Sequence, residues 1–171
     1  MKHLTKAILL VSALAVTACT NPDRFDNAGA GGGAAGAGAI VPGSASDPAS
    51  AAYFQQTVGD RVLFAVDQSS LSGEGIDVLT KQAAWLMENP LYTAIIEGHA
   101  DEQGTREYNL ALGARRASAV QNFLIERGVA PNRLKTVSYG KERPLEVCSD
   151  ETCYAKNRRA VTVLAAGGAT S

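Results

Sequence analysis

The sequence predicts an α/β protein, an α+β sandwich in which a βαβαβ core forms a mixed sheet with its helices packed on one face. Two observations lead to this fold class. Between residues 60 and 165, short runs rich in β-branched and aromatic residues alternate with longer stretches whose apolar residues recur at helical spacing. This region of about 105 residues is also long enough to bury one hydrophobic core.

The first half of this region is predicted to form a strand, a helix and a second strand. Residues 61–66 are a β-rich run. A helix then begins at Ser72 or Gly73 and ends before Pro90, which disfavours helical geometry in the residue ahead of it. Its apolar residues at helical spacing are Ile76, Leu79, Ala83, Leu86 and Met87. Residues 92–96 form the second strand.

The second half is predicted to add another helix and two more strands. The helix covers residues 105–127, and Gly128 supplies a suitable C-terminal stop. Residues 134–139 form a third strand. A loop that includes residues 142–154 then leads to residues 160–164, which close the sheet.

The first eighteen residues have the features of an export signal. Lys2 and Lys6 give a positive start, and residues 7–16 form an apolar run too short to anchor stably across a bilayer. The sequence Val-Thr-Ala-Cys at residues 16–19 resembles the lipobox of bacterial lipoproteins. This resemblance implies that the signal is removed and that Cys19 is acylated. The alternative is an ordinary secretory signal cut at the same place.

Residues 19–59 are expected to comprise the lipidated cysteine and a flexible linker. From about residue 27 to residue 52 the chain is mostly Gly, Ala, Ser and Pro, which cannot offset the entropy lost when a backbone becomes ordered. Thr20, rather than the aspartate that retains many lipoproteins at the inner membrane, follows Cys19. By the family rule this points to the outer membrane. Residues 166–171 are expected to be a disordered tail.

The charge balance disfavours some partners. The formal net charge is -1, and it becomes -3 when Lys2 and Lys6 leave with the signal. A mildly acidic chain does not favour nucleic acid or anionic lipid as its main partner. We expect no cofactor.

Two cysteines remain after Cys19 is assigned to lipid. Cys148 and Cys153 are separated by a short segment, and an exported protein meets an oxidising compartment, so they are candidates for a disulfide. The alternatives are two free thiols or a metal site. No histidine lies nearby, which disfavours a metal site.

The most informative segment combines residues 96–106 with residues 111–117. It places a strand end, a polar loop with carboxylates and an arginine-bearing helix in succession. Asp101 lies just past the strand end, where ligands of such sheets commonly bind. A carboxylate close to a guanidinium suits a zwitterion that carries an ammonium and a carboxylate. The alternative is that Asp101 only caps the following helix or loop.

These two segments belong to a longer set of motifs. The set continues with Val-Ser-Tyr-Gly-Lys-Glu-Arg-Pro at residues 137–144 and Lys-Asn-Arg-Arg-Ala at residues 156–160. Together they resemble the OmpA-like peptidoglycan-binding domain over about residues 60–164. The resemblance implies an OmpA-like core and, as its ligand, diaminopimelate of the peptidoglycan stem peptide.

The resemblance also implies roles for five residues. It assigns Asp101 to the ammonium of diaminopimelate and Arg116 to the carboxylate on the same carbon. Asn109 precedes Arg116 by seven residues, two helical turns, so both lie on one helix face. Asn157 and Arg158 match family positions that line the same groove.

Each arginine of the site has a neighbouring arginine. Spacing within the family motif selects Arg116, and Arg115 is then a solvated or salt-bridged side chain. Adjacent residues of an extended segment face opposite ways, so only one of Arg158 and Arg159 is expected to face the ligand, and we select Arg158.

The resemblance implies a lipoprotein of the outer membrane that faces the periplasm and is not an enzyme. Acylated Cys19 would lie in the lipid, and the folded head would bind peptidoglycan. Tol proteins (TolB-like) are implied as partners in a Tol system that supports envelope integrity and constriction at cell division. A stator-like peptidoglycan anchor is an alternative.

An enzyme is a different class of function. A peptidoglycan-processing enzyme would use Glu97, His99 or Asp101 as catalytic groups. However, His99 is the one histidine left after the signal is removed, and the sequence contains no Gly-x-Ser-x-Gly motif.

Overall fold

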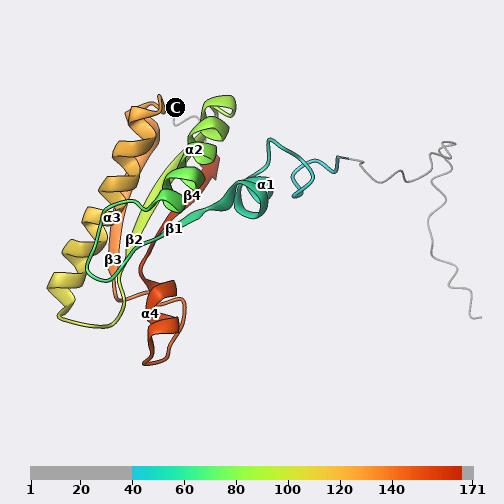
Figure 1. The fold of residues 1–171 in the computed structure, drawn as a ribbon. Helices are drawn as coiled ribbons and strands as arrows, with labels where there is room; N and C mark the ends of the chain where they lie inside the picture. The colour runs from blue at the N-terminus through green and yellow to red at the C-terminus, as the bar shows by residue number, and fades with distance from the viewer. Residues whose placement is uncertain (1–39, 167–171) are drawn as a thin grey trace, which may run out of the picture. The chain divides into compact units, whose positions relative to one another are not determined.

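The computed structural model describes residues 40–166 (Figure 1). The expected export signal, Cys19, the first part of the linker and residues 167–171 lie outside this range. The four strands are β1 (Arg61–Leu63), β2 (Tyr92–His99), β3 (Leu134–Gly140) and β4 (Arg159–Ala166). The helical segments are α1 (Ala51–Tyr53), η1 (Phe54–Gly59), α2 (Gly73–Glu88), α3 (Arg106–Glu126), η2 (Pro131–Arg133) and α4 (Glu151–Asn157). None of these helices is long and apolar enough to span a bilayer.

The strands form one mixed sheet in the order β1-β4-β2-β3. β4 is antiparallel to both of its neighbours, whereas β2 and β3 are parallel and are connected by α3. Helix α3 makes the crossover that a parallel pair requires. The last strand in the sequence therefore lies inside the sheet. The predicted α/β fold with helices on one face of a mixed sheet is confirmed.

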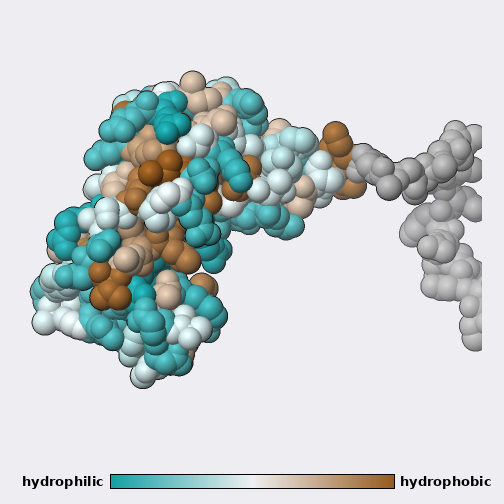
Figure 2. Space-filling view, viewed as in Figure 1, coloured by the Kyte–Doolittle hydropathy of each residue, from teal (hydrophilic) through white to brown (hydrophobic). Residues whose placement is uncertain are grey.

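Helices α2 and α3 contact each other and cover the same face of the sheet (Figure 1). Residues that alternate along the central strands, such as Ala94 and Ile96, are buried beneath them. Their neighbours Ile95 and Val163, which are register partners, are each 37% exposed on the uncovered face. In Figure 2 hydrophobic residues gather between α2 and α3, while the surface around α4 is largely hydrophilic.

Both long helices begin with a side-chain cap. The hydroxyl of Ser72 accepts a hydrogen bond from the backbone N–H of Gly75, and the hydroxyl of Thr105 accepts one from Tyr108. Each cap satisfies a backbone donor that has no partner within its own helix. Gly128 follows α3 with a φ of 101°, a conformation that favours glycine and ends the helix.

The folded part of the chain begins before Asp60, which corrects the expected extent of the linker. Residues 51–59 are helical rather than flexible, and Phe54 is fully buried in the core. The ring of Phe54 lies 4.9 Å from that of Trp85, whose indole N–H donates to the carbonyl oxygen of Pro48 at 2.7 Å. The composition of residues 27–52 conceals this segment because its two aromatic anchors, Tyr53 and Phe54, come after the Gly- and Ala-rich run.

Replacing Phe54 with alanine is expected to lower the free energy of unfolding by about 3–4 kcal/mol, because it leaves a cavity beside Trp85. Gln55→Ala is the matched control, since Gln55 is exposed in the same helical segment; its expected change is below about 0.5 kcal/mol. Urea unfolding of both variants measures the difference. Equal effects would contradict the placement of residues 51–59 in the core.

Two further segments differ from the prediction. Strand β1 ends at Leu63 rather than at residue 66, because the N–H of Phe64 donates to the carbonyl of Arg158 and the chain then turns. Residues 151–157, most of which fall in or beside the expected loop, form helix α4. The side chain of Asp150 caps this helix by accepting from the N–H of Cys153.

Candidate ligand site

A cavity of about 260 Å³ opens between the turn after β1, the loop after β2 and the start of α3. The size fits an amino-acid side chain or head group rather than a large ligand. Its lining residues are Val66, Asp67, Asp101, Gln103, Gly104, Tyr108, Asn109 and Leu112. Two carboxylates therefore face one small space.

Asp101 is 8% exposed and is held on both of its oxygens. Oδ1 accepts from the N–H of Gln103 at 3.3 Å, and Oδ2 accepts from Nη1 of Arg158 at 3.0 Å. A carboxylate oxygen has two acceptor sites, so Asp101 keeps capacity for a ligand that donates from the cavity. Thr105 rather than Asp101 caps α3, but the hydrogen bond from Gln103 means that Asp101 does cap the loop that follows β2.

Asp67 is a site residue that the sequence did not reveal. Its carboxylate lines the cavity and accepts a hydrogen bond from the hydroxyl of Tyr108. Its φ of 59° lies in the left-handed region, which aspartate tolerates better than most residues. A single aspartate in a turn carries no distinctive sequence pattern. Asp67 can therefore be recognised as a site residue only when the fold places its turn beside Asp101.

Asn109 lies at the cavity as expected and is 1% exposed. Its Nδ2 donates to the carbonyl of Gln103 at 2.7 Å, which fixes the loop that carries Asp101. Within residues 40–166, its Oδ1 accepts no hydrogen bond from the protein. A donor group of a ligand can therefore use that oxygen.

Arg116 is fully buried and does not line the cavity. Its Nε donates to the carbonyl of Gln68 at 2.8 Å, and Nη2 donates to that of Ala65 at 3.1 Å, so it holds the turn that contains Asp67. Nη1 donates to the carbonyl of His99 at 2.8 Å. Burial lowers the pKa of Arg116 to about 10, so the side chain stays charged at neutral pH. Three of its five N–H groups thus donate to backbone carbonyls of other segments.

Arg158 is 4% exposed and joins three parts of the fold. Its guanidinium donates to Asp101, to Glu151 of α4 and, through Nε, to the carbonyl of Phe64 at 3.3 Å. Burial opposes its charge, but the hydrogen bonds that it donates to Glu151 and Asp101 outweigh that effect and raise its pKa. Arg159 instead donates to the carbonyls of Asn157 and Arg143 and has no hydrogen bond to Asp101.

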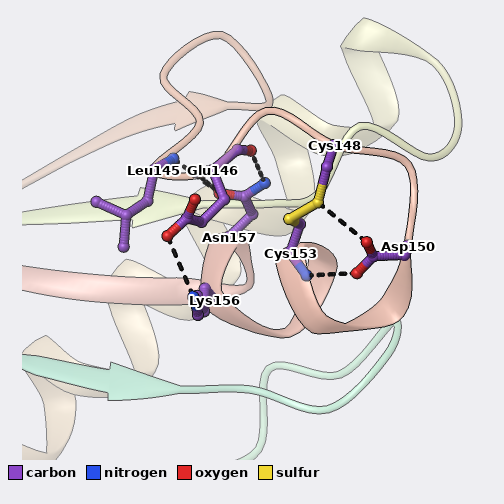
Figure 3. The surroundings of a disulfide bond; sticks show 7 residues. All are labelled: Leu145, Glu146, Cys148, Asp150, Cys153, Lys156 and Asn157. Atoms are coloured by element: carbon purple, nitrogen blue, oxygen red, sulfur yellow. Dashed lines mark hydrogen bonds and ion pairs between the residues drawn. A yellow bond between two sulfur atoms is a disulfide. The ribbon is translucent and has the colours of Figure 1, made fainter.

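Asn157 is placed in a supporting role rather than in the cavity lining. It is fully buried, and its Oδ1 accepts from the N–H groups of Leu145 and Glu146 at 2.7 and 3.1 Å. Its Nδ2 donates to the carbonyl of Glu146 at 2.8 Å (Figure 3). Asn157 therefore ties the loop before α4 to the end of that helix.

Cys148 and Cys153 form a disulfide at the other end of this loop (Figure 3). Their Cα atoms are 5.9 Å apart, and the carboxylate of Asp150 lies 3.3 Å from Cys148 Sγ. These three residues could otherwise present ligand atoms to a metal. Because a metal needs the thiolate form, the disulfide removes the two sulfur ligands.

His99 lies apart from the cavity lining. Its ring is 5.6 Å from that of Tyr139, and Nε2 is 3.6 Å from Oε2 of Glu97. Burial, followed by the charges of Arg159 and Arg143, lowers the pKa of His99 to about 4. Within residues 40–166 neither ring nitrogen has a hydrogen-bond partner. A neutral, enclosed imidazole away from the cavity is poorly placed as a general base.

The sheet order, the two helices on one face and the cavity at the end of β2 define an α/β domain with a small polar cavity at one end of its sheet. Residues 63–158 match the OmpA family model, and the chain belongs to the OmpA family.

The chain is similar over most of its length to proteins named peptidoglycan-associated lipoprotein. It is 51% identical to that of Mesorhizobium japonicum, over 94% of this chain and 92% of the relative. It is 38% identical to that of Haemophilus influenzae, over 94% and 98% respectively. A crystal structure of the peptidoglycan-associated lipoprotein from Burkholderia pseudomallei is 36% identical, with a TM-score of 0.65 over 70% of this chain and all of the other.

A more distant structure shares the fold alone. The C-terminal domain of Helicobacter pylori MotB is 22% identical, with a TM-score of 0.58 over 62% of this chain and 84% of the other. The architecture is thus common to proteins whose sequences have diverged widely.

Proposed function

We propose that the protein is an outer-membrane lipoprotein that binds peptidoglycan non-covalently and tethers the membrane to the cell wall. Its similarity to peptidoglycan-associated lipoproteins supports this general role. The lipobox at Cys19 supports a lipid anchor, and two or three acyl chains hold a protein firmly on a membrane. The head then faces the periplasm.

The observation that carries the ligand assignment is the cavity with Asp67 and Asp101 on its wall. Two carboxylates in a space of about 260 Å³ favour a cationic group, and an amino-acid ammonium has suitable size and charge. The guanidinium of Arg116 lies behind the same wall and supplies a positive charge that suits a carboxylate. We assign the site to the free zwitterionic centre of diaminopimelate, with Asp101 at the ammonium and Arg116 at the carboxylate. Asn109, Asn157 and Arg158 support this site.

The proposal includes a partnership with Tol proteins (TolB-like) in a Tol-Pal system. This part rests on the similarity to peptidoglycan-associated lipoproteins. A Tol protein that competes with peptidoglycan for the head would let the tether be redistributed as the envelope constricts at division.

Asp101→Asn is expected to weaken binding to isolated peptidoglycan sacculi at least tenfold, because it removes a charge-assisted hydrogen bond while preserving side-chain shape. Co-sedimentation of the mature protein with sacculi measures the effect. Glu102→Gln is the matched control, since it removes an adjacent carboxylate that is exposed and does not line the cavity. A folded Asp101→Asn variant that sediments like the wild type would contradict the site.

The same experiment tests the absence of catalysis. The protein is expected to remain bound to sacculi without releasing soluble fragments. Release of muropeptides into the supernatant would instead support a peptidoglycan-processing enzyme.

A further inference from the structure

Glu151 extends the charged groups behind the cavity beyond those assigned to the ligand. Its carboxylate binds the guanidinium of Arg158, and the same guanidinium binds Asp101. Asp101 and Arg158 are buried, whereas the side chain of Glu151 is 66% exposed. A row of alternating charges, negative on Asp101, positive on Arg158 and negative on Glu151, thus runs from the cavity wall to the surface.

The hydrogen bonds of Arg158 show what Glu151 does for Asp101. The carboxylate of Glu151 accepts from both Nη1 and Nη2 of Arg158, so the guanidinium meets Asp101 through Nη1 alone. Arginine and a carboxylate otherwise tend to form two parallel hydrogen bonds. Without Glu151, Nη2 would be free to turn toward Asp101 and engage its second oxygen. Glu151 therefore preserves acceptor capacity on Asp101 for a ligand.

The charge count points the same way. Asp67 and Asp101 face the cavity, and the guanidiniums of Arg116 and Arg158 lie behind it. These four groups sum to zero charge. The ammonium of Lys141, which donates to the carbonyl of Gly104 on the cavity wall, adds a positive charge. Glu151 offsets that charge and so keeps the surroundings of the cavity from becoming net positive, which would disfavour an ammonium.

The disulfide holds Glu151, which carries this negative charge, in place. Glu151 is the first residue of α4, and the Cys148–Cys153 bridge encloses that first turn. A helix of seven residues is too short to be stable without tertiary support. The bridge and the Asp150 cap supply that support on the side of Glu151, while Asn157 anchors the opposite end.

We propose that Glu151 is a positioning residue for ligand binding: it draws Arg158 into a single contact with Asp101, and the Cys148–Cys153 bridge holds it there. This inference rests on the proposed function, because it assumes that Asp101 receives the ammonium of the ligand. Glu151 itself does not touch the ligand.

The test compares two probes that differ in one charge. The first is a muropeptide with the free amine of diaminopimelate, and the second is the same muropeptide acetylated on that amine. Glu151→Gln is expected to bind the first probe about fivefold more weakly than the wild type and the second probe unchanged. Glu146→Gln is the matched control, because Glu146 lies in the loop just before α4 and pairs with exposed Lys156 rather than with Arg158. It is expected to leave both affinities unchanged.

The outcomes separate this inference from the proposed function. Equal weakening of both probes by Glu151→Gln would indicate a general structural defect and overturn the inference, as would wild-type affinity for both. If Asp101→Asn binds the free-amine probe normally, the proposed ligand site itself fails. Loss of binding in Asp101→Asn, with no selective effect of Glu151→Gln, rejects the role of Glu151 alone.

Reduction of the disulfide tests the second half of the proposal. A dithiol reagent delivers two electrons and two protons to the sulfurs of Cys148 and Cys153 and is itself oxidised to a disulfide. The reduced protein is expected to show the same selective, roughly fivefold loss for the free-amine probe. Unchanged affinity after complete reduction would show that the bridge does not hold Glu151 in place.

Discussion

Gly98→Ala is expected to lower the free energy of unfolding by more than about 3 kcal/mol or to prevent folding. A Cβ at position 98 would lie 1.8 Å from the carbonyl oxygen of Gly113 and 3.2 Å from the Cβ of Ala117. The first of these neighbours is helix backbone, which cannot move as a single side chain can. Helix α3 would therefore have to withdraw from β2. Urea unfolding monitored by circular dichroism measures the change.

Gly73→Ala is the control for this prediction. A Cβ at Gly73 meets nothing within 4 Å, and the residue begins α2. Alanine has the higher helix propensity, so this variant is expected to be neutral or more stable by up to about 1 kcal/mol. A Gly98→Ala variant as stable as Gly73→Ala would contradict the close approach of α3 to the sheet.

Arg116→Ala is expected to lower the free energy of unfolding by about 3–5 kcal/mol, because it removes a fully buried side chain together with the donors to three backbone carbonyl groups. The three carbonyls belong to Ala65, Gln68 and His99. Arg116→Lys is expected to recover only part of this loss, since a lysine ammonium cannot reproduce the planar fork of donors. Denaturant unfolding and sacculus co-sedimentation should be measured on the same preparations.

Arg115→Ala is the matched control. Arg115 is exposed on the same helix, with its guanidinium 5.9 Å from the ring centre of Tyr108, so its expected effect is below about 0.5 kcal/mol. Comparable losses in the two variants would contradict the selection of Arg116. The role of Arg116 in stability and its role in binding can be separated if Arg116→Lys stays folded but does not sediment.

Local patterns were sufficient to predict the four strands and the two long helices. The ends of the helices are marked by Ser72, Asn89-Pro90 and Gly128. The apolar residues between these positions follow helical or strand spacing. Patterns could not predict α1, η1 and α4, because short helices depend on tertiary contacts. The burial of Phe54 against Trp85 and the Asp150 cap beside the disulfide supply those contacts.

The candidate site was predictable only in part for a similar reason. Asp101 and Asn109 are close together in the sequence, and the structure places both on the wall of the cavity. Asp67 comes from a distant turn, and only the placement of β1 beside β4 brings it there. The position of a residue on a helical face also does not show how deeply its side chain is buried. The position of Arg116 behind the cavity depends on which backbone carbonyls approach it from other segments.

The position of β4 has a consequence for the order in which this domain folds. A chain made from its N-terminus delivers β1, β2 and β3 first, yet β4 must insert between β1 and β2. Arg158, the residue just ahead of β4, then completes its contacts with Asp101 and Phe64. The cavity is thus finished only when synthesis has reached the end of the domain.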